Sequence, residues 1–250
     1  MILKTLNGKQ FKELIFGGVL SLKAHCEEVD RLNVFPVPDG DTGTNMFRTI
    51  QGGWNEFAKA NEENLGEIGK LLSNGMLMSA RGNSGVILSQ IFRGICENLK
   101  GKEEVNAVQL ANAYKAGIER GYEAVVPAVE GTILTVFREA SEAARKLVNK
   151  DSTINDFYNE HLKAAKKALE NTINLLPVLK KAGVVDSGGA GYVYIVEGIV
   201  KCLNDEKIDE NFDIDKCHIF SAKIDGGTYY RYDMTTIFGG AFLGHDRFYS

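Results

Sequence analysis

The sequence predicts an all-α fold of about eight helices, followed by a short irregular or β-like C-terminal tail. Long segments with apolar residues three or four positions apart dominate the chain. Only four prolines occur in 250 residues, and alternating strand patterns are scarce before residue 210. The lack of strand–helix alternation and of a GxxxxGKS/T loop argues against Rossmann and P-loop folds.

The expected helices follow one another along the chain with short joints. Residues 9–31 carry apolar side chains at helical spacing, among them Phe11, Leu14 and Val29. Pro36 and Pro38 make the next segment extended, because proline lacks a donor and restricts the residue before it. We expect further helices at about 42–60, 65–81, 84–99, 105–125, 131–149, 153–175 and 188–203, with boundary errors of a few residues.

Composition describes one ordinary globular domain with an extension. Hydrophobic residues make up 44% and charged residues 25% of the chain. We place the domain at residues 8–203. The acidic stretch 204–216 is typical of a linker, and residues 217–250 form an unassigned tail whose paired glycines and aromatic residues suit short strands and turns.

Charge and cysteine usage favour a cytoplasmic protein that does not bind nucleic acid. The formal net charge is -4 and the pI about 5.7, without the basic surplus of a nucleic-acid-binding domain. No apolar run reaches transmembrane length, and the N-terminus lacks a signal-peptide core. The four cysteines are widely spaced, which indicates free thiols in a reducing compartment and disfavours zinc.

The most informative segment is 33–46, NVFPVPDGDTGTNM. It places Asp39 and Asp41 on either side of one glycine at the entrance to a helix. Carboxylates suit Mg²⁺, and phosphate oxygens favour the free N–H groups of a helix N-terminus. An ordinary Asp-Gly turn is the alternative, whereas an EF-hand is excluded because Thr44 and Ile50 stand where glycine and glutamate are needed. Asn33 is either a third oxygen ligand or a helix terminator.

Three further glycine-bearing joints precede expected helices, at 79–85 (SARGNSG), 130–132 (EGT) and 186–191 (DSGGAG). Each alone is explained as a helix cap or a tight helix contact, and we expect Asn83 and Ser84 to cap the helix that follows them. In an up-and-down bundle alternate helix starts share one end, so these loops could line a common rim. No Ser-His-Asp or Cys-His arrangement is legible, which is compatible with phosphoryl transfer.

Taken in order, these motifs match one family. The segments 33–46, 80–90 (ARGNSGVILSQ), 130–135 (EGTILT) and 185–190 (VDSGGA) resemble the nucleotide-binding domain of the bacterial fatty acid kinase ATP-binding subunit. That domain is homologous to the L subunit of dihydroxyacetone kinase. The similarity covers about residues 8–203. It implies a barrel of eight antiparallel helices, with ATP or ADP and two Mg²⁺ ions at one end.

The resemblance also implies roles for individual residues. Asp39 and Asp41 would hold the metal ions and act in catalysis, and Asn33 stands near the place where dihydroxyacetone kinase relatives use another aspartate. Contacts to phosphates or metal are implied for Thr44 and Asn45. The residues that would cradle phosphates are Asn83, Ser84 and Gly85. Those that would approach the nucleoside are Thr132, Asp186 and Gly188.

In this interpretation ATP phosphorylates a fatty acid held by a separate DegV-like binding protein, and the acyl phosphate feeds phospholipid synthesis. Activity is expected to need that partner and the regions that follow in longer family members; a homo-oligomer is compatible with it. One alternative is a dihydroxyacetone (glycerone) kinase subunit that keeps ADP bound. Relatives of that type carry a histidine where Thr42 stands, which favours ATP exchange here. Another alternative is a nucleotide-sensing module without turnover.

Overall fold

A computed structural model describes residues 2–58, 60 and 62–206, and it confirms the all-α fold. The described residues form ten helices and a sheet of two short strands. The eight long helices are α1 (Gly8–Ala24), α3 (Thr42–Ala58), α4 (Leu65–Ser79), α5 (Gly82–Leu99), α6 (Ala107–Glu123), α7 (Ile133–Leu147), α8 (Ile154–Leu175) and α10 (Ser187–Leu203). The two short ones are α2 (Cys26–Arg31) and α9 (Pro177–Ala182).

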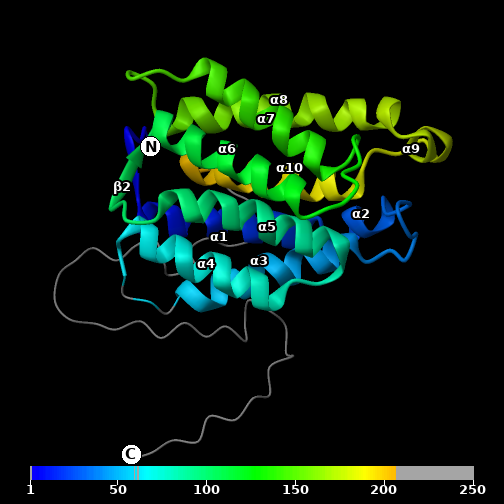
Figure 1. Ribbon diagram of the computed structural model, residues 1–250, viewed down its shortest axis with the longest axis horizontal. Helices are drawn as coiled ribbons and strands as arrows, with labels where there is room; N and C mark the ends of the chain where they lie inside the picture. Colours follow the sequence, from blue (N-terminus) through cyan, green and yellow to red (C-terminus); the bar gives the residue numbers. More distant parts are fainter. Residues whose placement is uncertain (1, 59, 61, 207–250) are drawn as a thin grey trace, which may run out of the picture. The chain divides into compact units, whose positions relative to one another are not determined.

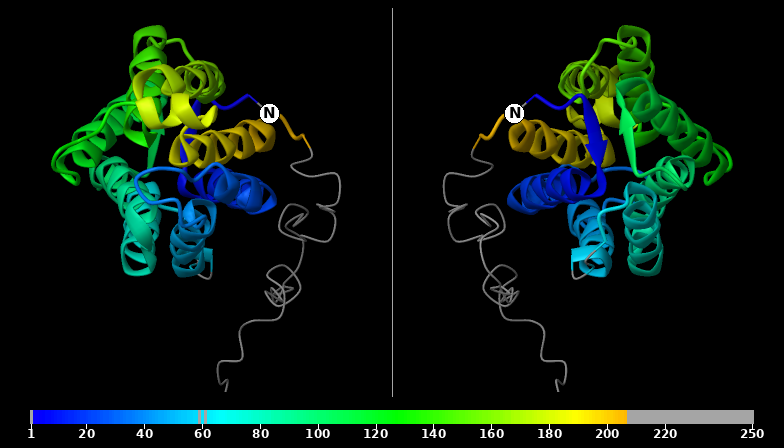
Figure 2. Two further views of the ribbon diagram at one scale, coloured as in Figure 1. Left: turned by 90° about the vertical axis from the view of Figure 1, so that its right-hand side faces the viewer. Right: turned by 90° about the vertical axis from the view of Figure 1, so that its left-hand side faces the viewer.

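The eight long helices close into an antiparallel barrel. Each packs against the next long helix along the chain, and α10 returns to pack against α1 (Figures 1 and 2). Because successive long helices reverse direction, α3, α5, α7 and α10 all begin at the same end of the barrel (Figure 1). The expected convergence of alternate helix starts is therefore confirmed.

The opposite end of the barrel carries the sheet, in which β1 (Thr5–Asn7) pairs antiparallel with β2 (Glu104–Asn106) (Figure 1). Each strand leads directly into a helix through the same device. Asn7 accepts the Gln10 N–H at 2.9 Å and Asn106 accepts the Gln109 N–H at 3.0 Å, and both glutamines return a bond to the cap backbone. Three-residue strands are too short for an alternating pattern, so the sequence did not predict them.

Two local features differ from the sequence prediction. The helix expected over 9–31 is broken at His25, where φ is -107° and ψ is 10°. The His25 ring stacks on Tyr194 with centroids 3.9 Å apart, and its Nδ1 lies 2.8 Å from the Ser21 carbonyl oxygen. The short helix α9 was not predicted; it begins at Pro177 and ends at Ala182, and the capping residue Gly183 adopts the left-handed conformation.

Aromatic side chains fill much of the barrel interior. One cluster joins α6, α7, α8 and α10 and consists of Tyr114, Phe137, Phe157, Tyr158, His161 and Tyr192. Within it His161 Nε2 lies 2.6 Å from the Tyr192 hydroxyl, and burial lowers the pKa of His161 to about 3. The imidazole is therefore neutral at physiological pH and belongs to the core.

Residues 207–216 of the predicted linker and the whole predicted tail, 217–250, lie outside the described residues. The domain boundaries at 8 and 203 stay a prediction. Among the described helices, none combines the length and the apolar character that crossing a bilayer requires.

Candidate functional site

A cavity of about 590 Å³ lies at the end of the barrel where α3, α5, α7 and α10 begin. Four segments line it: 33–42, 82–87, 124–134 and 186–188. Its volume falls in the range of about 300–1,000 Å³ that small-molecule sites occupy. The predicted site residues that it brings together are Asn33, Asp39, Asp41, Asn83, Ser84, Thr132, Asp186 and Gly188.

Asp39 and Asp41 form the acidic part of this cavity. Gly40 between them has a φ of +68°, a conformation that L residues with side chains rarely adopt, so the turn needs glycine. Both aspartates are exposed. Asp39 Oδ1 accepts a hydrogen bond from Asn33 at 2.7 Å, whereas the Asp41 carboxylate has no hydrogen bond or ion pair within the described part of the chain. Oxygen ligands are thus available here for a cation.

Asn33 is the buried residue that makes several of the hydrogen bonds in this loop, with 7% of its surface exposed. Its Nδ2 donates to Asp39 and to the Val37 carbonyl oxygen at 3.0 Å. Its Oδ1 accepts from the Thr42 hydroxyl at 2.8 Å and from the Ser187 hydroxyl at 3.5 Å. The amide therefore orients Asp39 and ties the starts of α3 and α10 together. Its predicted role as a third metal ligand stays a prediction.

The start of α5 supplies backbone donors to the cavity. The helix begins at Gly82, so Asn83 and Ser84 lie in its first turn, and the expectation that they cap it is wrong. Arg81 occupies the cap position and makes no side-chain cap bond. The first helical bond runs from the Gly85 N–H to the Arg81 carbonyl oxygen at 3.1 Å, which leaves the three preceding amides without a partner inside the helix. Such amides favour an anion.

Three predicted residues lie behind this surface instead of lining the cavity. The Thr44 N–H and hydroxyl both donate to the Asp30 carboxylate, at 3.0 and 2.8 Å. Asn45 is buried, and Gly85 allows α5 to approach α3, because a Cβ there would collide with the Thr49 hydroxyl. Their predicted contacts to phosphates or metal stay predictions. Sequence reasoning missed Asp30, because its partner Thr44 lies 14 residues further along the chain and no local pattern indicates the contact.

Thr132 and Asp186 cap the helices that begin on the other side of the cavity. Thr132 precedes α7 and accepts the Leu134 N–H at 3.4 Å; Asp186 precedes α10 and accepts the Gly189 N–H at 2.7 Å. Burial raises the pKa of Asp186 to about 6, although backbone hydrogen bonds from Gly189 and Ile133 oppose the shift. Gly188 packs against Ile133, where a Cβ would come within 3.3 Å.

The rest of the cavity wall is apolar. It combines side chains from the 33–42 segment, from α5, from the segment between α6 and α7 and from the first turn of α7: Phe35, Pro36, Val37, Val86, Ile87, Ala124, Val125, Val126, Val129, Ile133 and Leu134. The cavity thus has an acidic and amide-rich side and an apolar side. This division suits a ligand with a charged part and a flat apolar part.

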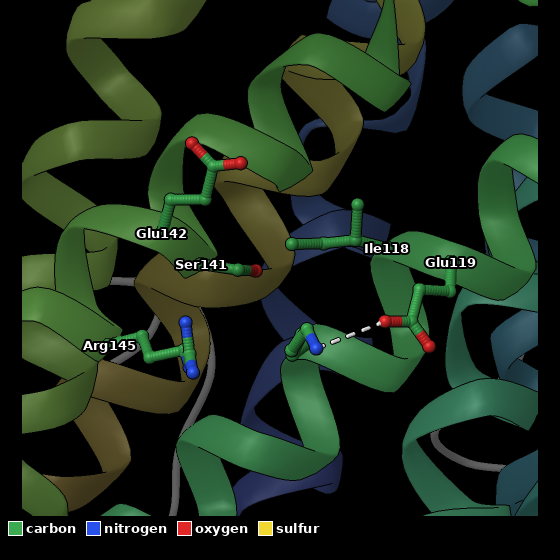
Figure 3. Close-up of a pocket in the computed structure, with 6 residues that line it drawn as sticks. Ile118, Glu119, Ser141, Glu142 and Arg145 are labelled. Carbon is green, nitrogen blue, oxygen red and sulfur yellow. Dashed lines mark ion pairs between the residues drawn. The ribbon is translucent and has the colours of Figure 1, made fainter.

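A second, smaller hollow of about 220 Å³ lies between α6 and α7 and is shown in Figure 3. Its lining residues are Lys115, Ile118, Glu119, Ser141, Glu142 and Arg145. Two of them, Lys115 and Glu119, form an ion pair at 3.4 Å. Eight of the predicted site residues line the larger cavity and none lines the smaller hollow, so the larger cavity is the candidate site.

The fold and this cavity define the class of the protein: a closed up-and-down helical barrel with a polar site where alternate helices begin. The DAK2 domain family matches residues 36–201, well over half of the chain. The chain belongs to the DAK2 domain family.

Close relatives occur in staphylococci. An uncharacterized protein of Staphylococcus epidermidis strain RP62A is 48% identical over 208 residues, and one of Staphylococcus aureus strain USA300 is 47% identical over the same length. Each match covers 83% of this chain but 38% of the relative, so the chain spans about two fifths of the length of these proteins.

Solved structures show the same fold. The dihydroxyacetone kinase of C. freundii in complex with AMP-PNP and Mg²⁺ matches with a TM-score of 0.59 at 17% identity, over 76% of this chain and 33% of that chain. The native form of that enzyme gives the same TM-score at 18% identity, over 80% of this chain and 35% of that chain.

Proposed function

We propose that this domain binds ATP with Mg²⁺ in the large cavity and supplies the phosphoryl group to a fatty acid carried by a separate DegV-like binding protein. Membership of the DAK2 domain family supports a kinase-type nucleotide-binding domain. The observation that carries the proposal is the pairing, in one cavity, of an unpartnered Asp41 carboxylate with the free amides at the start of α5. The proposal that a fatty acid is the acceptor rests on the resemblance of the sequence motifs to the fatty acid kinase subunit.

The acidic side of the cavity fits a magnesium–polyphosphate complex. Mg²⁺ is usually held by one or two carboxylates together with substrate phosphates, and Asp39 and Asp41 offer such a pair. No larger His, Cys, Asp or Glu cluster able to hold a metal occurs among the described residues. Asp39 and Asp41 would hold the Mg²⁺ ion, which would supply positive charge that offsets the negative charge of the phosphates. The C. freundii enzyme of the same fold was crystallised with AMP-PNP and Mg²⁺, which supports this ligand.

The protein's own contribution is positioning. Asn33 orients the Asp39 carboxylate, and the amides of Gly82, Asn83 and Ser84 would hold phosphate oxygens. A fatty acid carboxylate is already ionised at neutral pH, so it attacks the γ-phosphorus without a general base. The bond from that phosphorus to the β-phosphate oxygen breaks, an acyl phosphate forms, and ADP leaves.

The residue at position 42 argues against the alternative, a dihydroxyacetone kinase subunit that keeps ADP bound. This position carries histidine in relatives of that type. Here Thr42 is buried, and its hydroxyl is hydrogen-bonded to Asn33 and Ser187 at 2.8 and 3.3 Å. The hydroxyl therefore has a structural role in the loop.

Calorimetric titration with Mg-ATP tests the binding site. We predict that Asp41→Ala raises the Kd by at least about tenfold, the equivalent of one lost charge interaction of roughly 1.4 kcal/mol, and leaves the helix content unchanged. Asp151→Ala is the matched control, because Asp151 is an exposed aspartate in the loop between α7 and α8 at the opposite end of the barrel. Equal affinity of the Asp41 variant and the wild type would refute the metal assignment.

An assay with labelled ATP, a fatty acid and a DegV-like protein tests the transfer. We expect an acyl phosphate that disappears when the DegV-like protein is omitted. Failure to form it, with Mg-ATP binding intact, would reduce the proposal to a nucleotide-binding module without turnover.

A further inference from the structure

The segment 124–132, which we call the α6–α7 loop, forms much of the apolar wall of the large cavity. Among the described residues, few hydrogen bonds hold this loop in place. Val126 is 93% exposed, although it lines the cavity. Within the described residues, the hydrogen bonds that hold the loop lie at its C-terminal end, from Val129 onward. The position of the wall therefore depends on how that end is fixed.

Glu130 is the centre of that attachment. Its Oε1 accepts a hydrogen bond from the Tyr122 hydroxyl at 2.8 Å. Its Oε2 accepts from the Thr135 hydroxyl at 2.6 Å and from the Arg138 guanidinium at 3.0 Å. One carboxylate thus receives donors from the last turn of α6 and from the first two turns of α7.

The donors are themselves linked, so the cluster behaves as one unit. The Arg138 Nε–H donates to the Tyr122 hydroxyl at 2.9 Å, and the Thr135 hydroxyl accepts the Gly131 N–H at 2.7 Å. Partial burial acts to raise the pKa of Glu130, but the hydrogen bonds from Thr135, Tyr122 and Arg138 outweigh it and lower the pKa below its ordinary value. The carboxylate is therefore ionised at neutral pH, and its hydrogen bonds are charge-assisted.

We propose that Glu130 is a positioning residue, which sets the affinity for the nucleoside part of the ligand by holding the α6–α7 loop in place. This inference rests on the proposed nucleotide site. Glu130 does not line the cavity, whereas Val125, Val126 and Val129 do. The acidic and amide-rich side belongs to other elements, namely the 33–42 segment and the start of α5. Loosening the loop should therefore weaken contacts to the base and leave contacts to the phosphates unchanged.

Calorimetry with two probes distinguishes this role from a general structural one. Glu130→Gln keeps the shape of the side chain and removes its charge. We expect it to raise the Kd for Mg-ATP about tenfold, as for one lost charge-assisted hydrogen bond, and to leave the Kd for magnesium and inorganic triphosphate unchanged. Arg138→Met, which removes two donors from the other side of the cluster, should give the same selective loss.

Glu142→Gln is the matched control. Glu142 also faces Arg138, at 3.9 Å, but it lies on α7 away from the loop. Its loss should change neither Kd.

Hydrogen exchange of the free protein supplies a readout that needs no ligand. In Glu130→Gln the amides of the α6–α7 loop should exchange faster than in the wild type, while α6 and α7 keep their rates. Unchanged loop exchange, or an equal loss of affinity for Mg-ATP and triphosphate, would overturn the role of Glu130. A wild-type chain that binds neither probe would reject the nucleotide site and this inference with it.

Discussion

At the scale of single residues, Asp186 has a carboxyl group whose burial disfavours the ionised form. Only 5% of its surface is exposed, and burial raises its pKa from 3.8 to about 6. The folded protein therefore holds the proton more tightly than the unfolded chain. Stability from this group is present below about pH 4, falls as the pH rises towards 6, and stays reduced above that. Such a loss is tolerable if the ionised group serves the ligand.

Asp186→Asn should reveal this penalty. Asparagine keeps an oxygen that can accept the Gly189 N–H but carries no charge. We predict that the variant is more stable than the wild type at pH 7.5, by up to about 3 kcal/mol for a shift of about two pKa units, and that the gain shrinks towards pH 4. Urea unfolding at several pH values measures it. A difference that does not vary with pH would contradict the assigned shift.

The same scale separates what the sequence could predict at the site from what it could not. Asp39, Asp41 and the glycine joints were recognisable because a carboxylate pair or a helix start is a local pattern. The pairing of Asn33 with Ser187 was not, since only the folded barrel brings these distant residues together. The hydrogen bond from Arg138 to Glu130 is local, but its spacing matches no capping or helix-pair pattern.

At the scale of elements, α1 and α10 cross in close contact at two glycines. A Cβ on Gly17 would lie 2.6 Å from the Gly198 carbonyl oxygen, and one on Gly198 would collide with the Gly17 carbonyl oxygen. Periodicity predicted both helices but not this crossing, and it missed the break at His25 because the apolar spacing continues through it. The contact closes the ring, since it joins the first and last long helices.

Gly198→Ala should therefore destabilise the barrel. Backbone atoms would have to move apart, and we predict a loss of about 3 kcal/mol in the free energy of unfolding. Gly69→Ala is the control, because its Cβ would meet Cys96 at an ordinary 3.4 Å, and the better helix propensity of alanine should leave stability equal or raised by up to about 1 kcal/mol. Equal unfolding free energies for the two variants would argue against the close crossing.

At the scale of the whole molecule, the barrel interior contains a polar group that must stay uncharged. His161 is fully buried among aromatic rings, and burial lowers its pKa from 6.5 to about 3. Below pH 6.5 the unfolded chain takes up a proton that the folded protein refuses. Stability is therefore complete above pH 6.5 and decreases as the pH falls towards 3.

Replacing His161 should make the free energy of unfolding less dependent on pH below pH 6.5. The wild type should lose up to about 1.4 kcal/mol per pH unit below 6.5 through His161 alone. We predict that His161→Gln is less stable than the wild type at pH 7.5, since it disturbs a packed core, but loses less on acidification. Urea unfolding at pH 7.5, 6 and 5 tests this, and parallel profiles for the two proteins would exclude His161 as the source.

The most direct test of the nucleotide site is a crystal structure with Mg²⁺ and a non-hydrolysable ATP analogue. We predict a metal ion about 2.0–2.1 Å from a carboxylate oxygen of Asp39 or Asp41. Phosphate oxygens should accept hydrogen bonds from the amides of residues 82–84, and the base should lie against the α6–α7 loop. A nucleotide bound elsewhere, or a metal ion remote from both aspartates, would contradict the account.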